Sequence, residues 1–228
     1  MYQLFAKYYQ QIFPFNQEII TQLQPWIKKG KKATDLGCAT GELVYALFQE
    51  GMRVKGIDLD SQMIKLAHER FPFLDFDVMD MTYYLSQDND IDLITCFGNT
   101  LPHLNPKQLT MFFTQVNHAL AKDGTLIIQM LNYDKIMHEH PDHLPTIHRE
   151  SLTFERRYHY CADHLIFETN LTIGNQTING KTTLYPYLKN ELIDVIEQQD
   201  LKVKIFSNLD RAPWSINHTH QTLIITHG

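Results

Sequence analysis

The chain has 228 residues, of which 43% are hydrophobic, enough for the core of one large domain or of a domain with an insertion. Its net charge of −6 comes from 20 basic and 26 acidic residues, without the long Lys/Arg runs that serve binding to a nucleic-acid backbone. The three cysteines are scattered, as in proteins of a reducing compartment, and no stretch approaches a signal peptide or a membrane span. We expect a cytoplasmic protein without nucleic-acid or membrane partners; the sequence indicates no oligomeric state.

Residues 1–30 predict two amphipathic helices. Aromatic side chains recur at near-helical spacing until Pro14 interrupts them (Tyr2, Phe5, Tyr9 and Phe13), and a second apolar pattern extends from Ile19 to Ile27. Two interpretations are open. The helices could cap the edge of a sheet, or they could form a lid that excludes water from a bound ligand.

Residues 34–43 predict the end of a strand, a glycine turn and the start of a helix. Gly37 and Gly41 lack a Cβ and can adopt positive φ, so the backbone of the turn can approach a ligand closely. The helix that follows has one apolar face (Leu43, Ala46 and Leu47) and offers free N–H groups at the same point. This pattern predicts a ligand site at the turn.

Asp58 ends the next predicted strand, 21 residues after Gly37. In a doubly wound sheet the crevice lies outside the carboxyl ends of the strands, so Asp58 and the turn can reach one ligand, and the carboxylate could accept both hydroxyls of a ribose. A dinucleotide site requires Gly-x-Gly-x-x-Gly, and Ala39 takes the place of its second glycine. Glu42 adds a negative charge, which we interpret as a surface residue compatible with the helix dipole.

The following segments continue the alternation of helices and strands. Ser61 is expected to cap a helix, residues 73–79 alternate as a third strand that ends at Asp80, and residues 91–97 form an apolar run typical of a central parallel strand. A helix over residues 106–121 and a strand over residues 125–130 complete this part.

Four motifs in order resemble those of the class I S-adenosylmethionine-dependent methyltransferases. They are Asp35-Leu36-Gly37-Cys38-Ala39-Thr40-Gly41, Gly56-Ile57-Asp58-Leu59-Asp60-Ser61-Gln62-Met63, Val78-Met79-Asp80-Met81 and Ile91-Asp92-Leu93-Ile94-Thr95-Cys96-Phe97-Gly98-Asn99. The resemblance covers about residues 30–132. It implies a doubly wound, mostly parallel seven-stranded α/β sheet with S-adenosyl-L-methionine as cofactor.

The resemblance also implies which residues bind the cofactor. The methionine end would lie over Gly37–Gly41, the ribose on Asp58, and the adenine against Met63 with its amino group bonded to Asp80; Met63 could equally be a core residue. Tyr9 would border the cofactor from the predicted lid. The full expected set is Tyr9, Asp35, Gly37, Cys38, Ala39, Gly41, Asp58, Leu59, Met63, Asp80, Met81, Phe97 and Asn99.

Residues 133–183 interrupt the sheet pattern and predict an antiparallel insertion after the fifth strand. A His- and Pro-rich loop over residues 138–148 is followed by β-patterned runs at 152–160, 165–173 and 181–185, the last beyond the hairpin-type dipeptide Asn179-Gly180. We expect the insertion to bind substrate, residues 1–30 to form the lid, and residues 31–132 and 184–228 to bind the cofactor. Pro186 should begin a helix before the closing strands at 201–206 and 221–226.

If the resemblance holds, the reaction is methyl transfer to an N, O or C nucleophile of a small molecule by in-line displacement. His103 or Tyr133 would be the catalytic base where one is needed. The residues expected to contact substrate are Asn99, His103, Tyr133, Arg156, Tyr158, Arg211 and Trp214, with Arg149 and Arg157 as further candidates. Adjacent strand residues point to opposite faces, so at most one of Arg156 and Arg157 can face the pocket.

Two other functions and a metal site are alternatives to this hypothesis. The alternatives are an NAD-dependent oxidoreductase, disfavoured by Ala39, and a non-catalytic nucleoside-binding scaffold. The 12 histidines include the cluster His138, His140, His143 and His148, but these lie in predicted loops without the His-Glu-x-x-His spacing of a zinc site. We predict no metal.

Overall fold

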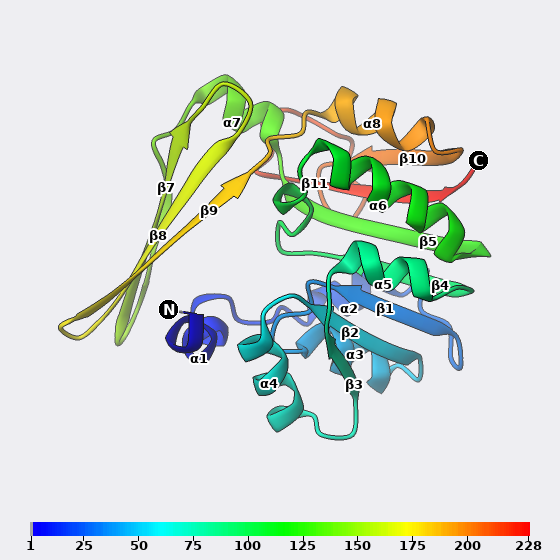
Figure 1. Cartoon of the computed structure of the whole chain (residues 1–228), viewed down its shortest axis with the longest axis horizontal. Helices are drawn as coiled ribbons and strands as arrows, with labels where there is room; N and C mark the ends of the chain where they lie inside the picture. Colours follow the sequence, from blue (N-terminus) through cyan, green and yellow to red (C-terminus); the bar gives the residue numbers. More distant parts are fainter. Residues whose placement is uncertain (1) are drawn as a thin grey trace.

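The computed structural model describes residues 2–228, with side chains from Phe5 onward, and has two β-sheets (Figure 1). The strands of the larger sheet are β1 (Lys32–Leu36), β2 (Arg53–Asp58), β3 (Asp75–Val78), β4 (Ile91–Cys96), β5 (Leu120–Leu131), β10 (Leu201–Phe206) and β11 (His220–His227). Their order is β10-β11-β5-β4-β1-β2-β3. β11 is antiparallel to both of its neighbours, and the other pairs are parallel. The predicted seven-stranded, mostly parallel sheet is confirmed.

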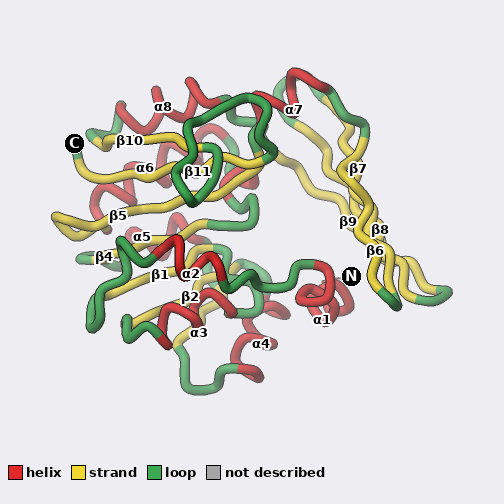
Figure 2. The backbone as a smooth tube through the Cα atoms, turned by 180° about the vertical axis from the view of Figure 1, so that it is seen from behind, coloured by secondary structure: helices red, strands yellow, loops and turns green. Residues whose placement is uncertain are grey.

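Helices cover both faces of this sheet (Figures 1 and 2). They are α1 (Tyr2–Ile12), α2 (Glu18–Leu23), α3 (Glu42–Gln49), α4 (Ser61–Arg70), α5 (Met81–Gln87), the 3₁₀ helix η1 (Leu101–His103), α6 (Pro106–Ala119), α7 (Tyr133–Glu139) and α8 (Lys189–Glu197). The helices α5, α6 and α8 bury their apolar residues in the largest core cluster, on one face. On the other face α2 and α3 pack over Ala33, Leu93 and Ile127. The side chain of Tyr2, part of the predicted aromatic face of α1, lies outside the described residues.

The smaller sheet is antiparallel, in the order β6-β7-β8-β9, and lies between α7 and α8 in the sequence. Its strands are β6 (His143–Arg149), β7 (Leu152–Tyr160), β8 (Leu165–Ile173) and β9 (Gln176–Leu184). It stands beside the carboxyl ends of the parallel strands, the side on which α1 also lies (Figure 1). The predicted antiparallel insertion after the fifth strand is confirmed.

Two details of that prediction are wrong. His143–Arg149 is the strand β6 and Tyr133–Glu139 is a helix, so the expected loop over 138–148 is largely regular structure. The dipeptide Asn179-Gly180 is not a hairpin turn but lies inside β9, where Gly180 pairs with Thr169. The turn between β8 and β9 is at Gly174, which has a φ of +55°. At Gly180 the cross-strand neighbour explains the glycine, because an added Cβ would lie 2.4 Å from Thr169 Oγ1.

Helix caps set where several elements begin. Asp60, not Ser61, caps α4, since its side chain accepts hydrogen bonds from the backbone N–H groups of Gln62 and Met63. Asn105 and Gln108 form a capping box at the start of α6. The helix expected from Pro186 begins at Lys189, after Leu188.

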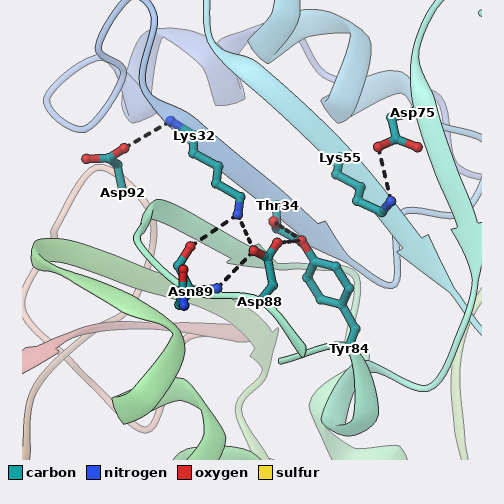
Figure 3. Close-up of polar contacts among 8 residues, drawn as sticks. All are labelled: Lys32, Thr34, Lys55, Asp75, Tyr84, Asp88, Asn89 and Asp92. Carbon is teal, nitrogen blue, oxygen red and sulfur yellow. Dashed lines mark hydrogen bonds and ion pairs between the residues drawn. The ribbon is translucent and has the colours of Figure 1, made fainter. Parts of the chain in front are cut away.

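A polar cluster ties α5 to the amino-terminal end of β1, away from the glycine turn (Figure 3). Asp88 accepts hydrogen bonds from the Tyr84 hydroxyl and from Lys32 Nζ, and Tyr84 also shares a hydrogen bond of 3.1 Å with Thr34. The backbone N–H of Lys32 donates to Asp92 at 3.0 Å. The pairing with Lys32 and Tyr84 holds the pKa of Asp88 below its usual range. This cluster anchors β1, the strand that leads into the turn.

Candidate active site

The glycine turn between β1 and α3 is closely packed on both sides. Gly37 has a φ of +77°, and a Cβ there would lie 2.5 Å from Thr100 Oγ1. Gly41 has a φ of +86°, and a Cβ there would lie 2.7 Å from the Phe76 ring. Both positions therefore require glycine. Ala39 also has positive φ, +46°, so it adopts a conformation that costs a side-chain residue about 1–2 kcal/mol.

Asp58 joins the end of β2 to this turn. Its Oδ2 accepts a hydrogen bond of 2.8 Å from the backbone N–H of Ala39, and its Oδ1 accepts one of 2.9 Å from that of Asp60. Each oxygen keeps a lone pair for a further donor, such as a ribose hydroxyl. Burial raises the pKa of Asp58. The following residue, Leu59, is 72% exposed, an apolar surface beside the carboxylate.

A pocket of about 730 Å³, including its open mouth, lies beside the turn. From the turn and α3 it is lined by Gly37, Cys38, Ala39, Glu42 and Leu43, and from the ends of the central strands by Asp35, Phe97, Gly98 and Gln129. The segment from Tyr9 to Ile19 forms its other wall. Tyr9, Asp35, Gly37, Cys38, Ala39 and Phe97, all expected from the sequence to bind the cofactor, thus line one space.

α1 is fixed over this pocket by a hydrogen bond that the sequence did not predict. Gln10 Nε2 donates to Thr40 Oγ1 at 2.7 Å, and Thr40 donates to Glu42 Oε2 at 2.7 Å. The other Glu42 oxygen forms an ion pair with Arg70. Glu42, expected to be a surface residue, is therefore largely buried; its side chain is 13% exposed. Sequence spacing carried no signal for this contact, because Gln10 and Thr40 are far apart in the chain.

The pocket is acidic. Asp35, which accepts a hydrogen bond of 2.7 Å from Thr95 Oγ1, is buried so deeply that its pKa is raised to about 7. Burial, with the negative charges of Asp58 and Glu42, raises the pKa of Tyr9 to about 12. Among the described lining residues there is no Lys or Arg. Such a site fits a ligand with cationic groups, as the ammonium and sulfonium of S-adenosylmethionine are, and offers no cation to a pyrophosphate.

The expected adenine-binding residues lie outside the lining of that pocket. Met63 is a buried residue of α4, and Met81 is a buried residue at the start of α5. Asp80 caps α5 by accepting a hydrogen bond of 2.8 Å from the backbone N–H of Thr82 through Oδ1. Its second oxygen has no protein donor among the described hydrogen bonds. Their contact with adenine remains a prediction.

A second polar group lies where β4 and β5 end. Asn99, with a φ of +67°, donates from Nδ2 to the Tyr133 hydroxyl at 3.0 Å and accepts from the backbone N–H of Leu131 at 3.2 Å. Tyr133 is fully buried, which raises its pKa. His103 lies in η1 with Nδ1 3.5 Å from Thr182 Oγ1 of β9. Desolvation by the surrounding protein lowers the pKa of His103, although the residue is exposed at the surface.

The predicted substrate residues divide into two groups. Arg156 and Tyr158 lie on the face of β7 that packs towards the larger sheet, whereas Arg157 is exposed, in line with the predicted alternation.

The other predicted substrate residues, Arg211 and Trp214, contact residues of other segments of the protein. The Arg211 guanidinium lies 5.7 Å from the centre of the Trp26 ring, and Trp214 donates from Nε1 to Gln221 Oε1 at 3.2 Å. Arg149 donates to the backbone oxygen of Gln11 at 3.1 Å, which ties β6 to α1.

Within the described side chains, no group of three or more His, Cys, Asp or Glu residues is placed to hold a metal ion. His140 instead stacks on Tyr160, with ring centres 4.8 Å apart. None of the helices in the described part of the chain has the length and apolarity that a membrane crossing requires.

Comparison with known proteins identifies a methyltransferase domain within the chain. Residues 33–124 match the model of a methyltransferase domain. A structure of an S-adenosylmethionine-dependent methyltransferase from Clostridium acetobutylicum superposes with a TM-score of 0.85 at 15% identity, over 100% of this chain and 99% of that one. Residues 33–124 are therefore a methyltransferase domain, and the whole chain has the fold of an S-adenosylmethionine-dependent methyltransferase. The acidic pocket beside the glycine turn fits the charge of S-adenosyl-L-methionine, the cofactor of that fold family.

Other relatives of this methyltransferase differ in the acceptors that their names state. Trans-aconitate 2-methyltransferase of Rhizobium meliloti is 35% identical over 43% of this chain and 37% of its own length. The S-adenosylmethionine-bound CalS10 of Micromonospora echinaspora, an amino pentose methyltransferase, has a TM-score of 0.73 at 16% identity, over 99% and 96% of the two chains. The chain spans between about two fifths and two thirds of the length of four curated relatives that it matches.

Proposed function

We propose that the methyltransferase transfers the methyl group of S-adenosyl-L-methionine to a nucleophilic N, O or C atom of a small molecule. The observation that carries the proposal is the junction of the glycine turn with Asp58. The hydrogen bond from Ala39 to Asp58 holds the two halves of a nucleoside site together, and the acidic pocket opens beside it. The sulfonium of the bound cofactor supplies the electrophilic methyl group.

The protein's task in such a reaction is alignment and the exclusion of water. Tyr9 and Gln10 cover the pocket from α1, and the hydrogen bond from Gln10 to Thr40 fixes that cover. Asn99 and Tyr133, bonded to each other at the ends of β4 and β5, are placed to orient the acceptor. We further propose that the 13 residues expected from the sequence to bind the cofactor do so.

Of the two candidate bases, His103 fits better than Tyr133. The lowered pKa of His103 keeps its imidazole neutral and able to accept a proton at pH 7. The raised pKa of Tyr133 keeps its phenol protonated, so this residue can donate a hydrogen bond but does not serve as a base. A base is required only where the acceptor must lose a proton as it reacts.

The acceptor is proposed to be a small molecule because the second sheet stands beside the carboxyl ends of the strands, where it can enclose an acceptor (Figure 1). The names of the relatives include a carboxylic acid, a quinone and an amino sugar as methylated compounds, so they do not select one nucleophile. The division of the chain into a lid, a cofactor part and a substrate part is part of the same proposal.

The test is a turnover assay with purified protein, S-adenosylmethionine and pools of small acids, amines and phenols. Mass spectrometry should find S-adenosylhomocysteine in an amount that matches the methylated product. The variant His103→Asn should lower turnover while the affinity for S-adenosylhomocysteine stays unchanged. Formation of NADH from NAD by the same preparation, without methyl transfer, would contradict the proposal.

A further inference from the structure

The inner face of the second sheet, which faces α1 and the larger sheet, is apolar at both ends. At one end Phe154 and Leu171 pack with Ile12 of α1. At the other end Tyr158 and Leu165 join the main core. Between them lies a polar row of three residues paired across the strands, Arg156 of β7, Thr169 of β8 and Gly180 of β9.

Arg156 is a half-buried cation without a counter-charge. No carboxylate oxygen of the described residues lies within 4.0 Å of it. Its Nη2 donates to the backbone oxygen of Pro145 at 2.6 Å, and its guanidinium lies 5.6 Å from the centre of the Phe154 ring. Its Nε is buried and has no hydrogen-bond acceptor. Leaving a buried charge unpaired costs free energy, which an anionic ligand would recover.

Tyr158 adds a second unsatisfied group on the same face. Its side chain is 4% exposed, and its hydroxyl has no hydrogen-bond partner. The positive charge of Arg156 is near enough to oppose the rise in the pKa of Tyr158 that burial causes. Of the other buried atoms without a hydrogen-bond partner, Glu42 Oε1 has the ion pair with Arg70, and those on Asn132, Gln221 and Thr222 lie at the ends of β5 and β11.

Gly180 keeps the third position of the row free of a side chain. A Cβ there would lie 2.4 Å from Thr169 Oγ1, so even alanine would displace the threonine hydroxyl. The Thr169 hydroxyl occupies the space over Gly180, so the row presents two polar side chains, those of Arg156 and Thr169. The glycine of the dipeptide Asn179-Gly180 is thus explained by its neighbour on the adjacent strand and not by a turn.

A line of polar groups connects this row to the proposed site of methyl transfer. Asn99 is bonded to Tyr133, and Tyr133 and Tyr158 are both buried in the main core cluster. Arg156 follows Tyr158 on the same face of β7. An acceptor with its nucleophile at Asn99 could therefore extend along the inner face to the guanidinium.

We propose that Arg156, assisted by the hydroxyls of Tyr158 and Thr169, binds an anionic group of the methyl acceptor, either a carboxylate or a phosphate. This inference rests on the proposed function, since it names a chemical class for the acceptor of that reaction. The nucleophile and the anionic group are separate parts of the acceptor. An anion satisfies both the unpaired charge and the donors on this face, and a neutral or cationic group does not.

The test observes the unsatisfied atom directly. The ¹⁵Nε–¹Hε signal of Arg156, assigned by its loss in Arg156→Gln, is followed by NMR in protein saturated with S-adenosylhomocysteine. Trans-aconitate serves as the carboxylate probe, inorganic phosphate as the phosphate probe and glycerol as the neutral control. We expect saturable shifts of this signal with one or both anions and none with glycerol. Arg157→Gln, which changes the exposed neighbour, should preserve the shifts.

A second measurement compares acceptors in matched pairs. When carboxylic acids and their amides are offered together at equal concentration, the acids should be methylated preferentially, and Arg156→Gln should reduce that preference about tenfold. An Arg156 signal that neither anion moves, or equal methylation of acids and amides, would overturn the inference. Because binding of S-adenosylhomocysteine is measured separately, its absence would count against the proposed function and not against the anion site.

Discussion

The glycine turn and the inner face of the second sheet differ in whether their buried polar groups have partners within the protein. Around the turn, Gln10, Thr40 and Asp58 have hydrogen-bond partners, and Glu42, whose Oε1 accepts no hydrogen bond, is neutralised by its ion pair with Arg70. On the inner face, the Nε of Arg156 and the hydroxyl of Tyr158 are buried without one. The first region is therefore preorganised for its ligand, whereas the second reaches its full set of hydrogen bonds only when a ligand supplies them.

The largest expected effect comes from Gly37→Ala, which breaks the preorganised region. The new Cβ would lie 2.5 Å from Thr100 Oγ1 at a φ of +77°, so we expect a loss of about 2–4 kcal/mol in the free energy of unfolding, with cofactor binding impaired. Urea denaturation measures the free energy of unfolding. The control is Gly174→Ala, which also has positive φ but meets no atom within 4 Å, and which should lose only about 1 kcal/mol.

Asp58→Ala tests the junction of the turn and β2. Loss of charge-assisted hydrogen bonds worth ~1.5–3 kcal/mol should weaken the binding of S-adenosylhomocysteine by about ten- to a hundredfold. Calorimetric titration gives the affinity. Asp77→Ala removes a carboxylate of the neighbouring strand that pairs with Lys55, and it should leave the affinity intact. Unchanged binding in the Asp58 variant would remove this residue from the site.

The pH dependence of cofactor binding tests the acidity of the pocket. Because the pKa of Asp35 is raised to about 7, its carboxylate is largely protonated at pH 6 and largely ionised at pH 8. We expect the affinity for S-adenosylmethionine to rise about tenfold over this range, since the cation binds the ionised form better. By the same shift, the free energy of unfolding of the free protein should fall as the pH rises from about 4 to about 7.

Asp35→Asn provides the control for that pH profile. The variant should bind the cofactor with an affinity that varies little between pH 6 and pH 8. A wild-type affinity that does not change over this range would show that Asp35 has no part in holding the cation.

Tyr158→Phe tests the unpaired polar groups on the inner face of the second sheet. Because the buried hydroxyl has no partner, its removal should increase the free energy of unfolding by about 1 kcal/mol while weakening acceptor binding. Tyr187→Phe is the matched control, since that hydroxyl donates to the backbone oxygen of Leu104 at 2.6 Å and its loss should destabilise the protein by about the same amount. Thermal unfolding of the two variants should shift in opposite directions.

The smallest expected effect concerns the cover of the pocket. Gln10→Ala removes the hydrogen bond to Thr40, worth about 0.5–1.5 kcal/mol, and should weaken S-adenosylhomocysteine binding about two- to tenfold. Gln11→Ala, on the exposed side of the same helix, should not change the affinity. If the two variants bind equally well, α1 does not act as a lid through this contact.

The two regions also differ in how far the sequence alone could predict them. The turn and Asp58 follow from local pattern, because glycine spacing and an acidic residue at a strand end are set within one βαβ unit. The inner face depends on pairing between strands. Gly180 looked like a turn residue because its constraint comes from Thr169 on another strand, and β6 was missed because histidines and prolines hide its alternation. The cover by Gln10 likewise depends on a contact between distant segments.

The most direct test of the account is calorimetric titration of the wild-type protein with S-adenosylhomocysteine and, separately, with NAD. The acidic pocket beside Asp58 predicts saturable binding of S-adenosylhomocysteine and no binding of NAD, whose pyrophosphate finds no cation among the described lining residues. Binding of NAD without binding of S-adenosylhomocysteine would contradict the account.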